Sequence, residues 1–230
     1  MEANNKEELN SGLTNRFCFS DLSIDEQEFL KHKKKQISYL KGENIFKQGA
    51  FAPYVIYILN GLVKVFLQTG YGKQINLRIA KPGDFLAFSS VFGEDIYTYS
   101  TIALTDIEIC MIDKSGLREL LKRNTDFAMA VTSRNYQNEK HLIEIISNIS
   151  YKQMRGKLAS ALLYLSSDDF EKENIFQFLS RQDLADFASI ANESTIRYLK
   201  EFEKDKIIAL DGKNIEILDK EKLEALSLRG

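Results

Sequence analysis

The sequence predicts an α+β fold: an N-terminal β jelly roll, a long helix, and a C-terminal winged helix-turn-helix. Short apolar runs separated by turn residues extend from about Ile37 to Ile112, a spacing typical of barrels and jelly rolls. The segment from Asp126 to Ile149 contains neither proline nor glycine, and its apolar residues recur with helical spacing. Two further helical segments and a pair of strands end the chain. We therefore predict three parts, residues 1–125, 126–149 and 150–230.

The N-terminal part carries clear strand and turn signals. The apolar run from Val55 to Leu59 ends at Asn60-Gly61, and Val63 to Leu67 follows with alternating polarity. Asn-Gly between two such runs predicts a β-hairpin, because both residues tolerate the positive φ that primed turns require. The further strands predicted by the same pattern are Gln74–Ile79, Tyr99–Leu104 and Glu108–Ile112.

The central part is predicted to be helical. A short helix from Ser115 to Arg123 precedes the long one, which would span about 36 Å. The long helix has more apolar residues than one face against a small barrel would bury, so we expect it to pack on a partner as well. A helix that merely links two domains is the alternative. Another helix is expected from Ser150 to Leu165, followed by a polar loop at Ser166–Asn174.

The segment from Ser180 to Lys204 has the pattern of a helix-turn-helix. Ser180 and Asp183 have the spacing of a capping box before a helix ending at Ala188. Ser189-Ile190-Ala191 would form the turn, and a second helix would run from Asn192 to Lys204. The N-terminal turns of such a helix enter the major groove of DNA, where Arg can bond guanine, Asn adenine and Glu the cytosine amino group.

A predicted hairpin follows the helix pair and gives the motif its wing. Ile207–Leu210 and Ile215–Leu218 flank Asp211-Gly212-Lys213-Asn214, which has a hairpin turn sequence. Among the exposed positions, Arg181 and Lys200 are better placed for phosphates, which position a protein without specifying sequence. A winged helix used only for protein contacts remains an alternative. The predicted DNA-binding residues are Ser180, Arg181, Gln182, Asn192, Glu193, Ser194, Arg197 and Lys200.

Composition limits the other functions. The net charge is −2, so affinity for DNA must come from local placement of cations rather than overall charge. No apolar run approaches the length of a membrane span, and the first fifteen residues lack the apolar core of a signal peptide. Two distant cysteines indicate reduced thiols and a cytoplasmic protein. With two histidines and no catalytic constellation, we expect no enzyme, no metal site of cupin type and no membrane partner.

Several motifs together resemble the Crp/Fnr family, the cyclic-AMP receptor protein and its relatives. The helix-turn-helix carries Leu179–Ala185 and Asn192–Arg197, and upstream Lys41-Gly42-Glu43, Leu59-Asn60-Gly61 and Pro82-Gly83-Asp84-Phe85 match the glycine turns of that family's barrel. The resemblance covers the chain from about Phe19. It implies a cyclic-nucleotide-binding-like barrel that senses an effector, a homodimer joined by residues 126–149, and a two-fold site on double-stranded DNA. RNA polymerase is a further candidate partner, at Ser166–Asn174.

The resemblance also assigns roles in DNA reading. The family's base contacts fall on Glu193 and Arg197. The family's usual Arg before the Glu is Asn192 here, so the preferred DNA sequence should differ. The family's turn glycine is Ser189 in this chain, which leaves the exact turn geometry open.

The effector site departs from the family pattern. The family's Gly-Glu-Leu segment is Ala87-Phe88-Ser89 here, and its phosphate-binding Arg-Ser pair falls on Tyr97-Thr98. Without that cation a cyclic phosphate loses a charge-assisted bond, so we predict that cyclic AMP does not bind usefully. Iron–sulfur sensing needs about four cysteines. Haem needs His or Cys ligands near the pocket; His32 and His141 are expected to be surface or hydrogen-bonded histidines, and His141, on the predicted dimer helix, remains the alternative ligand. No cofactor is predicted.

An unknown small effector of apolar or aromatic character remains the prediction for the barrel. In the alternative, the aromatic side chains fill the barrel and no ligand binds. The function expected is sequence-specific, dimeric transcription regulation independent of cyclic AMP; the alternative is a ligand-binding adaptor that acts through protein contacts. The predicted pocket residues are Phe85, Phe88, Ser89, Ser90, Tyr97, Thr98, Tyr99, Leu142 and Ile143.

Overall fold

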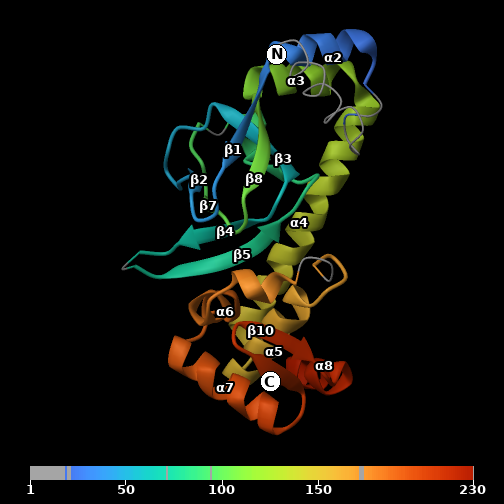
Figure 1. The fold of residues 1–230 in the computed structure, drawn as a ribbon. Helices are drawn as coiled ribbons and strands as arrows, with labels where there is room; N and C mark the ends of the chain where they lie inside the picture. The colour runs from blue at the N-terminus through green and yellow to red at the C-terminus, as the bar shows by residue number, and fades with distance from the viewer. Residues whose placement is uncertain (1–18, 20–21, 71, 94, 171–173, 230) are drawn as a thin grey trace. The chain divides into compact units, whose positions relative to one another are not determined.

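The computed structural model describes residues 19, 22–70, 72–93, 95–170 and 174–229 (Figure 1). The chain divides into two compact units. The first takes its residues from Met1–Gln68 and Arg78–Lys140, and the second from Thr69–Leu77 and His141–Gly230. Each unit is described separately below.

Two four-stranded sheets form the described β-structure of the N-terminal part, as expected for a jelly roll. The first has the order β1 (Lys34–Tyr39), β8 (Ile107–Asp113), β3 (Tyr54–Asn60), β6 (Phe85–Leu86). The second has the order β2 (Asn44–Phe46), β7 (Ser100–Ala103), β4 (Val63–Gln68), β5 (Gln74–Ala80). Both sheets combine strands from distant parts of the chain, and the predicted α+β class with a β jelly roll is confirmed.

The predicted hairpin at Asn60-Gly61 is wrong. β3 pairs with β8, with Tyr57 opposite Cys110, whereas β4 pairs with β7 in the other sheet. Gly61 has φ +82°, and a Cβ built on it would lie 2.4 Å from the carbonyl oxygen of Asp106. The positive φ expected for this residue is therefore present, but it serves a corner where the chain changes sheets against another loop.

Gly61→Ala is expected to destabilise the first unit by about 2–4 kcal/mol. A left-handed conformation costs a non-glycine residue about 1–2 kcal/mol, and the overlap with the Asp106 carbonyl adds a similar amount. Gly42→Ala is the matched control, because Gly42 has φ +89° with no atom within 4 Å of an added Cβ. Urea unfolding of both variants checks the prediction, which fails if the two midpoints fall equally.

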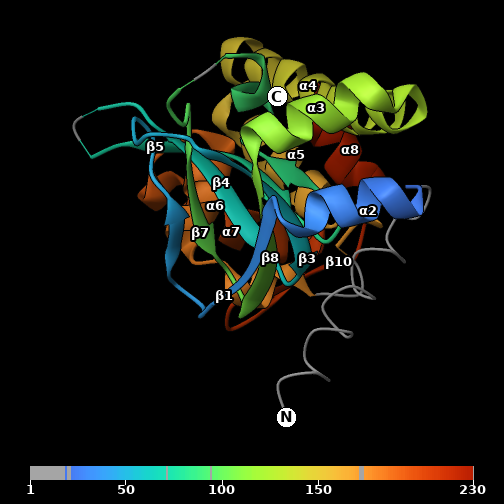
Figure 2. The ribbon, with the colours of Figure 1, turned by 90° about the horizontal axis from the view of Figure 1, so that it is seen from above.

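Two helices lie beside each other at one end of the barrel, α2 (Ile24–Lys31) and α3 (Lys114–Arg123) (Figures 1 and 2). Sequence patterns predicted α3 to within one residue but did not predict α2. The 3-10 helix η1 (Phe88–Phe92) follows β6. One core joins the β1-β8-β3-β6 sheet to α3 and to the start of the next helix, with Tyr57, Leu117, Leu120, Phe127 and Val131 among its buried members.

The long helix α4 runs without interruption over Thr125–Tyr151. It confirms the predicted helix at Asp126–Ile149 and extends it by one residue at the start and two at the end. Among the residues that the structure describes, no helix is long and apolar enough to cross a membrane.

A winged helix-turn-helix occupies the second unit, as predicted. Its elements are α5 (Met154–Leu165), η3 (Ile175–Phe178), α6 (Arg181–Ala188), α7 (Asn192–Lys204), β9 (Ile208–Asp211), β10 (Asn214–Ile217) and α8 (Lys220–Arg229). Its core is formed by buried apolar residues that include Leu158, Leu162, Leu184, Ala185, Leu199, Phe202, Ile208, Ile215 and Leu223.

The terminal helix α8 was not predicted from the sequence. Leu223 anchors it in the core, where it is fully buried. A polar contact adds to this, because Lys152 Nζ donates to Ser160 Oγ of α5 at 2.8 Å and to Ser227 Oγ of α8 at 3.0 Å. The C-terminal helix is therefore held against α5 by both apolar packing and hydrogen bonds.

Candidate functional site

The first helix of the motif, α6, begins at the predicted capping box. Ser180 Oγ accepts a hydrogen bond from the Asp183 amide at 3.1 Å, and the Asp183 carboxylate accepts one from the Ser180 amide at 2.8 Å. These two bonds satisfy backbone donors that the first helical turn leaves open. The cap fixes where α6 starts, and it places Leu184 and Ala185 in the core.

The turn between α6 and α7 is formed by Ser189, which ends α6 with φ 52° and ψ 45°. The Ile190 amide donates to the Ala185 carbonyl at 3.1 Å, the bond expected of a Schellman motif. This left-handed position is the one that glycine occupies in the family resembled above. Ser189 Oγ is also buried, with no hydrogen-bond partner in the described part of the chain.

Ser189→Gly is expected to stabilise the second unit by about 1 kcal/mol. Glycine removes the steric cost of the left-handed conformation and the buried unpaired hydroxyl, and the greater entropy of unfolded glycine offsets part of that gain. Thermal unfolding should show a melting temperature a few degrees higher. Ser189→Ala serves as the control because it removes the hydroxyl and keeps the strained Cβ. A glycine variant no more stable than the alanine variant contradicts the backbone argument.

The second helix of the motif, α7, presents a charged face to solvent. Thr195, Leu199 and Phe202 are buried on one side, while Glu193, Arg197 and Lys200 are exposed. These three charged residues are four and three positions apart, which places them on one face of a helix. The Arg197 guanidinium lies 4.7 Å from the ring centroid of its neighbour Tyr198, which restricts its conformations.

The start of α7 is open in a way that suits phosphate binding. Its N-cap residue, Ala191, makes no side-chain capping bond, and uncapped N–H groups at a helix N-terminus attract anions. Asn192 Oδ1 is buried and has no hydrogen-bond partner among the described residues. A bidentate contact with adenine uses that oxygen, so the predicted base contact of Asn192 requires its side chain to rotate.

Two of the remaining predicted DNA-binding residues are already hydrogen-bonded within the second unit. Gln182 Nε2 donates to Asp186 Oδ1 at 2.8 Å, and Arg181 Nη2 donates to the Gly212 carbonyl at 2.7 Å. Ser194 is half-buried. The structure therefore gathers Glu193, Arg197 and Lys200 on one exposed face, and joins Arg181 to the wing.

Two amides of β5 also hold α6, and no pattern in the sequence indicated them. Gln74 Nε2 donates to Asp186 Oδ2 at 2.7 Å, and the fully buried Asn76 donates to the Asp183 carbonyl at 3.0 Å. All four residues belong to the second unit. Amide donors rather than cations bond to the Asp186 carboxylate, so they fix α6 without adding positive charge to it.

Two family models match the chain, a cyclic nucleotide-binding domain over residues 36–124 and a Crp-like helix-turn-helix domain over residues 156–226. The anaerobic regulatory protein of Bacillus subtilis is 31% identical over 210 residues, which cover 87% of each chain. The chain belongs to the Crp/Fnr family of transcription regulators. It is thus a regulator with a helix-turn-helix DNA-binding domain.

Other relatives of this Crp/Fnr regulator agree. The cAMP-activated global transcriptional regulator CRP of Salmonella typhimurium is 26% identical over 183 residues, 78% of this chain and 87% of that protein. A CRP/FNR-family regulator from Thermus thermophilus has a TM-score of 0.69 at 23% identity, covering 85% of this chain and 100% of that one. FixK2 from Bradyrhizobium japonicum has a TM-score of 0.71 at 18% identity, covering 84% and 96%. The two structures support the fold.

Aromatic side chains predicted to line the effector pocket pack on each other or on the core. Phe85 is buried, with its ring centroid 4.9 Å from that of Tyr57 and 6.0 Å from that of Phe88. Tyr97 stacks on Phe46 at 4.0 Å. Burial raises the pKa of Tyr97 to about 12. This phenol therefore stays neutral at physiological pH, as a donor or acceptor of hydrogen bonds.

Tyr99 bonds to the backbone of the turn after β6. Its hydroxyl accepts a hydrogen bond from the Ala87 amide at 2.7 Å, and burial raises its pKa. Ala87 itself has φ 56°, so this contact supports a strained residue. Tyr99 also lies 5.5 Å from Phe46, ring centroid to centroid, which brings it into the same cluster as Tyr97.

The other predicted pocket residues are dispersed. Ser89 and Thr98 are exposed, whereas Ser90 is buried with no partner for its hydroxyl in the described part of the chain. Leu142 and Ile143 are exposed on the part of α4 that belongs to the second unit. The pocket and its unknown effector therefore remain predictions.

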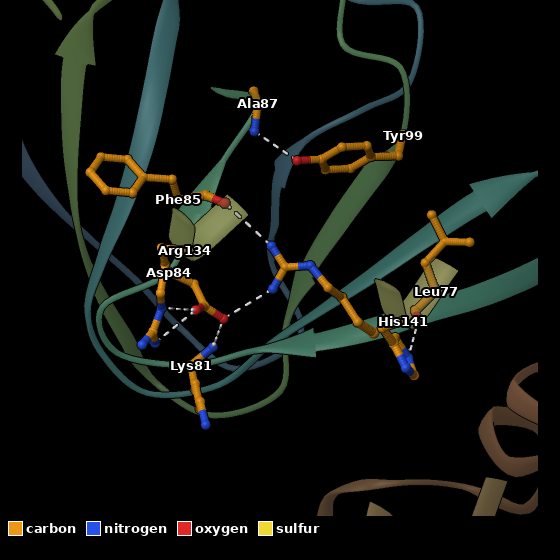
Figure 3. Close-up of polar contacts among 9 residues, drawn as sticks. Leu77, Lys81, Asp84, Phe85, Ala87, Tyr99, Arg134 and His141 are labelled. Atoms are coloured by element: carbon orange, nitrogen blue, oxygen red, sulfur yellow. Dashed lines mark hydrogen bonds and ion pairs between the residues drawn. The ribbon is translucent and has the colours of Figure 1, made fainter. Parts of the chain in front are cut away.

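A buried ion pair beside these aromatics was missed at the level of sequence. The Asp84 carboxylate accepts from Arg78 Nη1 at 3.0 Å, from Arg134 Nη2 at 3.0 Å and from the Lys81 amide at 3.0 Å. Arg78 also donates to the Phe85 carbonyl at 3.2 Å. Figure 3 shows the carboxylate of Asp84 facing Arg134 and the backbone of Lys81. Arg78 lies on the polar side of the alternating pattern Gln74–Ile79, so the sequence did not indicate that it is buried.

No cluster of three or more His, Cys, Asp or Glu residues in the described part of the chain could hold a metal ion. Cys110 is buried, and burial raises the pKa of its thiol to about 12. A thiol in that state is a poor nucleophile and a poor metal ligand.

Proposed function

We propose that this protein is a homodimer that reads a two-fold DNA site through α7 and does this without cyclic AMP. The exposed face of α7 is the observation that carries the proposal. Glu193 and Arg197 have the chemistry to read base edges, and Lys200 lies further along the helix, where it suits a phosphate. The DNA target also supports a cytoplasmic location.

An apolar stripe on α4 supports the homodimer. Met129 is 65% exposed, Tyr136 67%, Ile143 64% and Ile146 63%. The first three are seven residues apart and the fourth follows after three, a spacing that places all four on one side of a helix. Residues on the inner side of α4, Phe127 and Val131, are buried in their own unit. A second copy of α4 is therefore the partner that this stripe fits.

Among the residues that the structure describes, the lack of free charged side chains at the predicted effector pocket supports independence from cyclic AMP. Phe88 and Tyr97 stand where the family resemblance places a carboxylate and the phosphate-binding arginine, and neither supplies a charge. The neighbouring cation Arg78 is already bonded to Asp84 and to the Phe85 carbonyl. A cyclic phosphate would have to displace this ion pair, at a cost in buried charge. Calorimetric titration with cyclic AMP should give no heat of binding; micromolar affinity contradicts the proposal.

Arg197→Ala is expected to weaken binding to the cognate DNA site by about 1–3 kcal/mol per contact and to relax the preference for one base pair. The reason is that a guanidinium bonds guanine O6 and N7 together, and alanine bonds neither. Binding should be measured by fluorescence anisotropy on the cognate site and on variants with single base changes.

Lys200→Ala is the matched control on the same face of α7. If Lys200 contacts a phosphate, this variant should weaken binding to all sequences equally and reduce the dependence of affinity on salt. If Arg197→Ala instead weakens binding to every DNA sequence equally, Arg197 contacts a phosphate rather than a base. A native protein that binds no DNA over the salt series would support the adaptor alternative.

A further inference from the structure

Arg181 joins the first helix of the motif to the tip of the wing. It is the first residue of α6, and its Nη2 donates a 2.7 Å hydrogen bond to the carbonyl oxygen of Gly212. Gly212 lies in the turn between β9 and β10, thirty-one residues later in the chain. Arg181 is half-buried, and this partial burial lowers the pKa of its guanidinium.

The wing needs such a contact. Its two strands have four residues each and pair from Asn214 opposite Asp211 to Ile217 opposite Ile208. A two-stranded hairpin of this kind is marginally stable by itself. Ile208 at its base and Ile215, one pair before the turn, are buried, whereas Gly212 and Lys213 in the turn itself are exposed. The bond from Arg181 is the contact that fixes the carbonyl at this tip.

The turn chemistry is consistent with a defined tip. Gly212 has φ +56°, and positive φ at the first central residue is typical of the primed turns, whose twist suits a tight hairpin. The conformation directs the Gly212 carbonyl to Arg181, and the next residue, Lys213, is an exposed cation. A rigid tip places that cation at one distance from α7, whereas a mobile tip spreads it over many positions.

We infer that Arg181 is a positioning residue, whose guanidinium holds the wing tip so that Lys213 meets a DNA phosphate. This inference rests on the proposed function, because it requires the winged helix-turn-helix to bind DNA. A guanidinium has five N–H donors, and the bond to Gly212 uses one of them. Arg181 can therefore face a phosphate of its own at the same time, and the contacts of α6 and of the wing become energetically coupled.

A double-mutant cycle on the full-length protein tests the coupling. Lys213→Ala should weaken binding about tenfold in the native background, as expected when a dimer loses a phosphate contact in each subunit, and reduce the slope of log affinity against log salt by about two. In the Arg181→Ala background the same change should weaken binding less than twofold, because the tip is no longer held. Equal factors in the two backgrounds, or no effect of Lys213→Ala on the native protein, overturn the inference.

Two further variants serve as controls for this cycle. Lys200→Ala, on α7, should weaken binding by the same factor with and without Arg181, since additivity is expected of sites that share no partner. Arg181→Lys keeps a charged donor and should restore the effect of Lys213→Ala. If Arg181→Lys behaves as Arg181→Ala does, the hydrogen bond to Gly212 is not the source of the coupling.

Backbone relaxation gives a readout without DNA. In the free protein, the amides of Gly212 and Lys213 should have order parameters near 0.85, falling below about 0.6 in Arg181→Ala. Lys213→Ala, which changes the same loop and keeps the contact, should leave them unchanged. Unaltered order parameters in Arg181→Ala overturn the positioning role. If the native protein binds no DNA, the proposed function fails, while the relaxation result still decides whether Arg181 orders the wing.

Discussion

Asp84→Ala is expected to destabilise the first unit by about 3–5 kcal/mol, the usual cost of removing one partner from a buried ion pair. The Asp84 side chain is 9% exposed and that of Arg78 is 11% exposed. Without the carboxylate, Arg78 remains buried near a second guanidinium, that of Arg134, which bonds to the same carboxylate at 3.0 Å. Urea unfolding followed by tyrosine emission measures the loss, since the chain has no tryptophan.

Asp95→Ala is the control for this prediction. Its carboxylate bonds to Lys114 Nζ at 2.6 Å but is 75% exposed, so solvent screens the pair and we expect a much smaller loss of stability than for Asp84→Ala. Replacing Asp84 and Arg78 together by apolar residues of similar size, with Arg134→Gln, should recover much of the stability, because no unpaired charge is then buried. Equal losses for Asp84→Ala and Asp95→Ala would show that burial does not strengthen the interaction.

The helix-turn-helix could be predicted residue by residue because its signals are local. Ser180 and Asp183 are three positions apart and make the bonds their spacing implies. Helix periodicity, together with this cap, placed both α6 and α7, and Thr195 is buried on the inner side of α7. The wing also follows from one turn between two short apolar runs. Each of these predictions depends on residues that lie close together in the sequence, within about one or two helical turns.

The barrel could be predicted as a class but not in its connections. Asn60-Gly61 has the sequence of a hairpin turn, yet β3 pairs with β8, about fifty residues away, because both faces of the β3 strand become buried there. Which strands pair is decided by long-range packing that no turn residue records. Arg78 was missed for the same reason, since its meaning depends on Asp84 and Arg134, which reach it from a turn and from α4.

The proposed dimer interface lies between these two cases. The helical period predicted two apolar aspects for α4, and the structure shows Phe127 and Val131 buried and Ile143 and Ile146 exposed. The helical period alone could not show which apolar residues of α4 remain exposed, because the buried and the exposed residues recur with the same spacing. Phe127 and Val131 are buried by the core of their own unit, and that packing involves residues far away in the sequence.

Ile143→Glu is therefore expected to raise the dimer dissociation constant by more than a hundredfold, and to reduce binding to a two-fold DNA site by at least as much. Ile143 is part of the exposed stripe, seven residues from Tyr136 and three from Ile146. In a symmetric dimer the same patch meets itself, so two carboxylates would face each other in an apolar seam. Burial without a partner and like-charge repulsion both oppose association. Sedimentation equilibrium measures the change directly.

Glu144→Lys tests whether position rather than charge decides the outcome. Residue 144 is next to Ile143 but about 100° around the helix, and its side chain is 59% exposed. This variant should remain a dimer with nearly native affinity for DNA. Ile143→Leu should also remain a dimer, since it keeps the apolar volume. An Ile143→Glu protein that stays dimeric would place the interface elsewhere, and the exposed stripe would then need a different partner. A monomeric Ile143→Glu protein that keeps native affinity for a single half-site would show that each α7 binds DNA independently of the dimer. The exposed stripe on α4 would then increase affinity for the two-fold site by linking two such DNA-binding domains.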